Sequence, residues 1–249
     1  MLTEKRYSLI LEIVNSNGSA RIQDLCSALN TSESTIRRDL NALSKSGMLK
    51  KVHGGAVALN DNFSLTEHTV EEKEVLFIEE KTAIAQYAAS LVNENDFIYI
   101  DAGTTTEKMI GFIKCKNVIC VTNGFINAKK LALQGFKVFI PSGEIKASTE
   151  SVIGAECVNS LQNFNFTKCF MGVNGISKPG GLTTPDTNEA AVKRAAIERS
   201  RDIYILADHS KFDKITSVRF APLNVGKIIT DRLSDMSFLS DANIKEVFK

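Results

Sequence analysis

Residues 32–45, which read SESTIRRDLNALSK, predict an amphipathic helix with one apolar and one polar face. With an advance of about 100° per residue, Ile36, Leu40 and Leu43 fall within a narrow arc and must pack inward. The opposite face carries hydrogen-bonding and basic side chains, namely Ser34, Arg38, Asn41 and Lys45, with Arg37 beside them. A helix in the major groove of DNA requires such side chains, because they bind base edges and phosphates.

Two further helices are expected before this segment. Apolar residues recur at helical spacing within residues 7–14, and Asn17-Gly18 ends that helix. A shorter helix with an apolar stripe follows in residues 22–29. The polar break at residues 30–32 leads into the third helix, for which Ser32 is a favourable N-cap. Two helices joined by a tight polar turn predict a helix-turn-helix.

A short hairpin is expected after the third helix. Beyond Gly47 the sequence MLKKVHGGA, at residues 48–56, alternates apolar and basic residues before a glycine turn. Such a hairpin, or wing, would present Lys50, Lys51 and His53 to the DNA backbone.

Arginines on an isolated helix usually belong to a solvated face, so Arg37 and Arg38 alone do not establish DNA binding. Their context favours it. The run TIRRDL at residues 35–40, followed by Gly47 and by HGGA at residues 53–56, closely resembles the DNA-binding signature of the DeoR family. This resemblance covers about residues 5 to 57, and it implies that the third helix contacts operator DNA while the wing holds the flanking phosphates. The expected DNA-binding residues are Ser34, Thr35, Arg37, Arg38, Asn41, Lys50, Lys51 and His53.

The length and charge of the chain fit a small domain followed by a larger one. Residues 1–58 carry 8 Lys or Arg and 5 Asp or Glu, net +3, whereas the remainder of the 249 residues carries 22 and 24, net −2. No apolar run approaches a membrane span and the first residues lack the features of a secretory signal, so a cytoplasmic protein is expected. We expect a winged helix-turn-helix at residues 1–57, a polar linker at 58–74 and a second domain at 75–249.

The cysteines and histidines do not suggest a metal site. The five cysteines are odd in number and scattered among apolar neighbours, and the three histidines are dispersed. We therefore expect no metal and reduced cysteines in the core, at Cys26, Cys115, Cys120, Cys157 and Cys169.

Beyond residue 75 the sequence predicts alternating helices and strands. A long helix is expected near residues 78–92, followed by short apolar segments that each end in polar residues. The segments are residues 97–100, 118–121, 138–140, 169–173, 203–207 and 228–229. This alternation is typical of a Rossmann-like, mostly parallel α/β sheet, in which ligands gather outside the carboxyl ends of the strands.

The most informative of these endings is DAGTTT, at residues 101–106, where a strand should pass into a helix. Gly103 would let the backbone approach an anion, and the threonine hydroxyls and the helix dipole would favour its binding. The run lacks the spacing of both GxGxxG and GxxxxGK[ST], and an ordinary N-cap is the alternative interpretation.

The same endings, from DAGTT through GVNGI and GLTTPD to ADHSKF, are similar to the C-terminal sensor domain of the DeoR family. That domain is related to ribose-5-phosphate isomerases and binds sugar phosphates. The resemblance implies that the phosphate is held by Gly103, Thr104, Thr105 and Thr106, with Asn123, Glu144, Glu189, Asp208 and Lys211 near the sugar. Asp101 and Asn174 complete the expected effector site. Family members commonly have Asp in place of Asn174, and an amide binds a hydroxyl but is no general base, so catalysis is not expected.

These observations favour a repressor that binds a palindromic operator as a dimer or tetramer and releases it when a phosphorylated sugar occupies the sensor domain. No cofactor and no membrane are expected. The run GLTTPD followed by EAAVK resembles family members that control fructose or tagatose use, which favours a ketose phosphate such as fructose 1-phosphate. Two alternatives are an active sugar-phosphate isomerase that carries a DNA-binding module, and a ligand-independent assembly domain.

Overall fold

The computed structural model describes residues 2–58, 63–64, 69–233 and 235–248. The chain divides into two compact units. The first unit comprises Met1–Asn62 and Glu71–Ile78, and the second comprises Phe63–Val70 and Glu79–Lys249.

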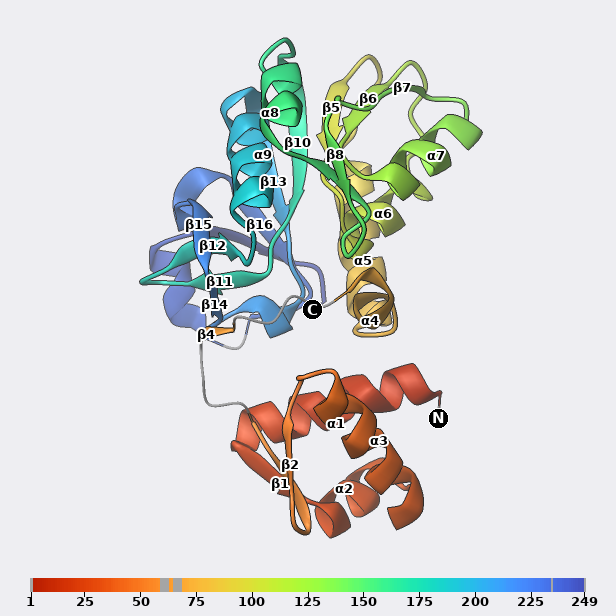
Figure 1. The fold of residues 1–249 in the computed structure, drawn as a ribbon, viewed down its shortest axis with the longest axis vertical. Helices are drawn as coiled ribbons and strands as arrows, with labels where there is room; N and C mark the ends of the chain where they lie inside the picture. Colours follow the sequence, from red (N-terminus) through yellow and green to blue (C-terminus); the bar gives the residue numbers. More distant parts are fainter. Residues whose placement is uncertain (1, 59–62, 65–68, 234, 249) are drawn as a thin grey trace. The chain divides into compact units, whose positions relative to one another are not determined.

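Residues 3–57 of the first unit form the three helices and the hairpin that the sequence predicts, and a further strand completes a small antiparallel sheet (Figure 1). The elements are α1 (Thr3–Asn17), β1 (Ser19–Arg21), α2 (Ile22–Leu29), α3 (Glu33–Lys45), β2 (Lys50–Val52) and β3 (Gly55–Val57), with strand order β1-β3-β2. Ser32 caps α3 by accepting from the Thr35 N–H. The core includes Ile10, Val14, Leu25, Ile36, Leu40, Leu43, Leu49 and Ala56.

The turn of the wing requires glycine. Gly55 lies opposite Arg21, where β3 passes so close to β1 that a Cβ would be 2.2 Å from the carbonyl oxygen of Ala20. Gly54 has φ 82°, a backbone conformation that favours glycine. The pair Gly54-Gly55 therefore allows the hairpin to close against β1.

The second unit is built on a seven-stranded sheet in which all neighbouring strands are parallel. The order is β17-β16-β13-β10-β5-β6-β7. These strands are β5 (Phe97–Ile100), β6 (Ile119–Thr122), β7 (Lys137–Phe139), β10 (Phe166–Gly172), β13 (Ser200–Leu206), β16 (Lys227–Thr230) and β17 (Asn243–Glu246). The expected α/β class with a mostly parallel sheet is confirmed, although β17 was not predicted.

Helices cover both faces of this sheet (Figure 1). The helices α5 (Ile78–Ser90), α6 (Thr104–Ile110) and α7 (Phe125–Leu133) pack with Ile98, Ile100 and Phe170 on one face. On the other face, α8 (Ala155–Leu161) and α9 (Thr187–Glu198) pack with Tyr99 and Cys169. All five cysteines are free thiols; three are buried and two, Cys26 and Cys115, are half-buried.

Short antiparallel strands form separate small sheets beside the seven-stranded sheet. They form a hairpin of β8 (Glu144–Lys146) with β9 (Ser151–Ile153), and a three-stranded sheet of β11 (Gly175–Ser177), β12 (Gly181–Thr184) and β15 (Val218–Ala221). Three 3-10 turns, at His209–Lys211, Leu223–Val225 and Met236–Ser240, complete the unit. No helix in the described part of the chain is long and apolar enough to cross a membrane.

The segment expected to be a linker, residues 58–74, contains secondary structure. Phe63–Ser64 forms β4, which pairs in parallel with β14 (Ile215–Thr216), and Val70–Glu74 forms α4; residues 59–62 and 65–68 lie outside the described residues. The expected start of the second domain at residue 75 also differs from the observed division, because Leu76 and Phe77 pack into the core of the first unit.

Candidate functional site

The polar face of α3 and the wing form one surface of the first unit. On α3, Ser34, Arg37, Arg38 and Asn41 are exposed and Thr35 is half-buried; on the wing, Lys50 and His53 are exposed and Lys51 is half-buried. The Lys51 Nζ donates to Asn41 Oδ1 at 2.6 Å and so joins the wing to the helix. All eight residues predicted to bind DNA therefore belong to these two elements.

The two arginines of this surface differ in their partners. Arg37 binds Glu33, one helical turn earlier, with Nε 2.9 Å from Oε1. Both side chains are about half exposed, so this ion pair contributes little stability. The Arg38 guanidinium group makes no hydrogen bond or ion pair with any described residue.

The inner side of α3 contains a charged residue that the sequence reasoning did not single out. Asp39 is 2% exposed, and it binds Arg6 of α1 with Nε 2.5 Å from Oδ2 and Nη2 3.1 Å from Oδ1. The hydrogen bond to Asp39 raises the pKa of Arg6. A signal existed in the sequence, because Asp39 lies only about 60° from Ile36 around the helix and thus on its inner half.

In the second unit, Asp101 follows β5 and is held by a lysine from a distant helix. The Lys193 Nζ of α9 lies 2.5 Å from Asp101 Oδ2 and also donates to the Gly172 carbonyl at 3.1 Å. The Gly172 N–H donates to the same carboxylate oxygen at 2.9 Å. Burial raises the pKa of Asp101, while Lys193 and the Gly172 N–H oppose that effect. The positive charge of Lys193 offsets the negative charge of Asp101, so this ion pair has no net charge beside the turn that follows β5.

That turn has the expected form of a strand passing into a helix. Gly103 has φ 154°, and α6 begins at Thr104. Thr106 Oγ1 lies 2.7 Å from the Asp101 carbonyl and 2.8 Å from that of Gly103, so this hydroxyl is used within the turn. Thr104 is buried and Thr105 is half-buried.

Asn123, at the end of β6, braces the same turn. Its Oδ1 accepts from the Tyr99 hydroxyl at 2.9 Å and from the Ala102 N–H at 3.0 Å, and its Nδ2 donates to the Val152 carbonyl at 3.2 Å. The structure thus places the Asn123 side chain against the turn that follows Asp101, and most of its hydrogen-bonding capacity is used within the protein.

Glu189 lies in the first turn of α9 and is bound on both oxygens. Lys146 and Thr149, from the β8–β9 hairpin, lie 3.2 and 2.9 Å from Oε1, and Thr184 Oγ1 lies 3.0 Å from Oε2. The Thr184 hydroxyl is also 3.1 Å from Asn174 Oδ1. Burial would raise the pKa of Glu189, but the charges of Lys193 and Lys146 lower it below its ordinary value.

Glu144 does not join this cluster. It is exposed at the start of β8, and within the described chain its carboxylate makes no hydrogen bond or ion pair. The lysines of the cluster were not predicted as site residues. Lys193 follows Glu189 by four residues and so shares its helix face, which is a recognisable signal, whereas Lys146 is brought in only by the hairpin.

Asp208 follows β13 and has one satisfied and one unsatisfied oxygen. Its Oδ1 accepts from the N–H and the hydroxyl of Ser210. Its Oδ2 is buried and meets no hydrogen-bond donor in the described structure. Burial would raise the pKa of Asp208, but the charges of Lys211 and Lys81 lower it to about 2. A carboxylate at neutral pH, with one oxygen lacking a donor, is suited to accept a hydrogen bond from a ligand hydroxyl.

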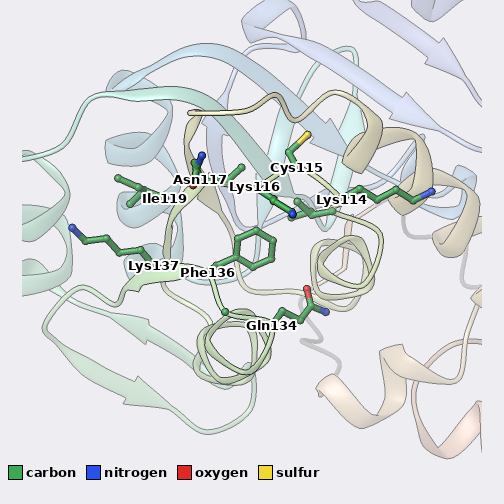
Figure 2. A pocket seen from close by; sticks show the side chains of 11 residues that line it. Lys114, Cys115, Lys116, Asn117, Ile119, Gln134, Phe136 and Lys137 are labelled. Atoms are coloured by element: carbon green, nitrogen blue, oxygen red, sulfur yellow. The ribbon is translucent and has the colours of Figure 1, made fainter.

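These residues lie at one edge of the sheet. Strands β5, β10 and β13 are neighbours in the sheet order, and Asp101, Asn174 and Asp208 follow their carboxyl ends. A pocket of about 620 Å³ lies elsewhere, near the amino ends of β6 and β7 (Figure 2). None of the predicted effector residues lines it.

The chain matches two family models and several curated proteins. The model of the DeoR-like helix-turn-helix domain matches residues 6–62, and that of the DeoR C terminal sensor domain matches residues 76–232. The chain is 40% identical to the uncharacterized HTH-type transcriptional regulator FruR of Bacillus subtilis, over 96% of this chain and 94% of that protein. It is 35% identical to a lactose phosphotransferase system repressor of Staphylococcus epidermidis, over 91% of both chains.

Solved structures whose backbone aligns with part of this chain include an isomerase and a regulator. Ribose 5-phosphate isomerase A of Neisseria gonorrhoeae aligns with a TM-score of 0.40 and 17% identity, over 55% of this chain and 54% of that one. The sorbitol operon regulator SorC of Klebsiella pneumoniae aligns with a TM-score of 0.37 and 13% identity, over 84% and 90%.

Proposed function

Because this chain belongs to the DeoR family of DNA-binding transcriptional repressors, we propose that it controls a sugar-catabolism operon and leaves its operator when a phosphorylated sugar binds the sensor domain. It acts in the cytoplasm as a dimer or tetramer, so that paired recognition helices meet the two half-sites of a palindrome. The family members it matches are regulators, and the chain is not an enzyme.

The observation that supports a sugar phosphate as the ligand class is the presence of two features at the carboxyl ends of the strands. The turn at Gly103 offers backbone N–H groups to an anion beside the neutralised Asp101, and Asp208 Oδ2 offers an acceptor to a hydroxyl. Strands β5 and β13 are separated by one strand, which corresponds to about 10 Å. A sugar phosphate has a phosphate at one end and hydroxyls along its length, and this chemistry fits both features.

Phosphate recognition is expected to dominate ligand binding. Fructose 1-phosphate should bind, while free fructose should bind at least about tenfold more weakly, since charge-assisted hydrogen bonds to the phosphate are lost. Calorimetry on both sugars, after a thermal-shift survey of pentose and hexose phosphates, measures the difference. Equal affinity for fructose and its phosphate would contradict the assignment of the turn. If no sugar phosphate raises the melting temperature, the second unit is a ligand-independent assembly domain.

Lys211→Ala is expected to make the repressor hard to induce. Lys211 lies in the 3-10 turn capped by Asp208, in the unit that does not contain α3. Loss of this side chain should weaken binding of the sugar phosphate and leave operator affinity unchanged. An effector that barely binds the repressor cannot drive its release from the operator. Operator release against fructose 1-phosphate concentration measures the effect, with the exposed Lys129→Ala as the matched control. Superimposable release curves for Lys211→Ala and the wild type would remove Lys211 from the site.

A further inference from the structure

The buried ion pair between Arg6 and Asp39 restricts the relative orientation of the two side chains as well as the distance between them. The planar guanidinium meets the carboxylate with two N–H···O bonds, one from Nε and one from Nη2. The two side chains are 10% and 2% exposed. Neither residue belongs to the surface formed by α3 and the wing, yet Asp39 directly follows Arg38 in the recognition helix.

Stability alone does not require a charged pair at this position. Moving two charges out of water is costly, and an apolar pair of similar volume often makes a protein equally or more stable. The pair lies in a unit whose core already joins α1, α2 and α3 through buried aliphatic side chains such as Ile10, Leu25 and Leu40. A directional role explains the pair better than a contribution to the free energy of folding.

The quantity that such a pair controls is the rotation of α3 about its own axis. Apolar contacts of Ile36, Leu40 and Leu43 hold the helix against the core but are not directional. A rotation of about 10° moves an atom at a radius of about 6 Å by about 1 Å. Donor–acceptor distances in hydrogen bonds span only about 0.5 Å. A small rotation at Asp39 would therefore take Arg38 out of reach of a base edge.

We propose that Arg6 and Asp39 are positioning residues for DNA recognition. Their ion pair sets the rotation of α3 and thereby the direction in which Arg38 leaves the helix, without touching DNA. It follows that loss of the pair impairs recognition of sequence rather than attraction to the phosphate backbone, which depends on net charge.

The test compares two affinities at one salt concentration for each variant. One duplex is an operator selected from random-sequence DNA by the wild-type protein, and the other is an unrelated duplex. Asp39→Asn and Arg6→Met change the net charge in opposite directions, so their affinities for the unrelated duplex should move in opposite directions. The ratio of operator to unrelated affinity should fall about tenfold in both, as for the loss of one base contact. A role through charge alone would leave both ratios at the wild-type value.

Two further variants separate positioning from folding. Arg6→Met with Asp39→Leu removes both charges and replaces them by apolar volume, so this double variant should remain folded by circular dichroism and still show the lowered ratio. Ile36→Val is a matched core control that keeps the pair; it should lose some stability and retain the wild-type ratio. A wild-type ratio in the folded double variant would overturn the proposal, as would an equally lowered ratio in Ile36→Val.

Discussion

Lys193→Met is expected to destabilise the second unit by about 3–5 kcal/mol at neutral pH, because it leaves the carboxylate of Asp101 buried without its charge partner. The two side chains are 7% and 2% exposed, and their charged atoms are 2.5 Å apart. Urea denaturation followed by circular dichroism measures the free energy of unfolding. The matched control is Lys129→Met, at an exposed lysine of α7, which should stay within about 0.5 kcal/mol of the wild type.

The deficit of Lys193→Met should depend on pH. Burial already raises the pKa of Asp101, and removing Lys193, which opposes that effect, raises it further. A carboxyl group with a raised pKa in the folded state contributes stability below its unfolded pKa of about 3.9, and loses it as pH rises through the folded pKa. Lowering the pH from 7 towards 4 should therefore reduce the difference from the wild type.

A double variant tests the same interpretation at constant pH. Asp101→Asn with Lys193→Met removes both charges and should recover most of the stability lost in Lys193→Met. If the double variant is as unstable as the single one, or if the deficit of Lys193→Met is the same at pH 5 and pH 7, the loss arises from packing rather than from the charge of Asp101.

Arg38→Ala should cost about 1–3 kcal/mol of operator binding, the value of one good base contact. Arg38 is exposed on α3, opposite the buried face of that helix, and its guanidinium group makes no hydrogen bond or ion pair with the described residues. The fold should be retained, with a free energy of unfolding within about 0.5 kcal/mol of the wild type. Mobility-shift titrations at fixed salt measure the loss, and Lys129→Ala controls for the removal of one positive charge.

The salt dependence separates two kinds of contact by Arg38. If Arg38 contacts a base edge, Arg38→Ala should lower the affinity for the operator and leave the affinity for unrelated DNA unchanged. A contact to phosphate predicts that both duplexes weaken and that the slope of log affinity against log salt falls by about 1. Unchanged affinity for the operator would mean that α3 is not the helix in the groove.

The sequence by itself determined the elements whose signals are local. The arc of Ile36, Leu40 and Leu43, the N-cap at Ser32 and the glycine turn of the wing all depend on neighbours within a few residues, and the structure contains each of them. The parallel sheet was also predictable, because its buried strands are short apolar runs with polar endings. The short strands β8 and β17 were not, since each contains a single apolar residue, Ile145 or Ile244, and so forms no apolar run.

Only the tertiary structure decided which charged residues meet. Arg6 binds Asp39 across 33 residues and Lys193 binds Asp101 across 92. The helical pattern places Asp39 on the inner half of α3 and Lys193 on the same face as Glu189, but it does not identify the partner of either residue. Asn123, expected near the sugar, is largely occupied in bracing the turn at Asp101. Side-chain patterns specify which face of an element is buried, but an ion pair between elements depends on their packing and register, which local periodicity does not encode.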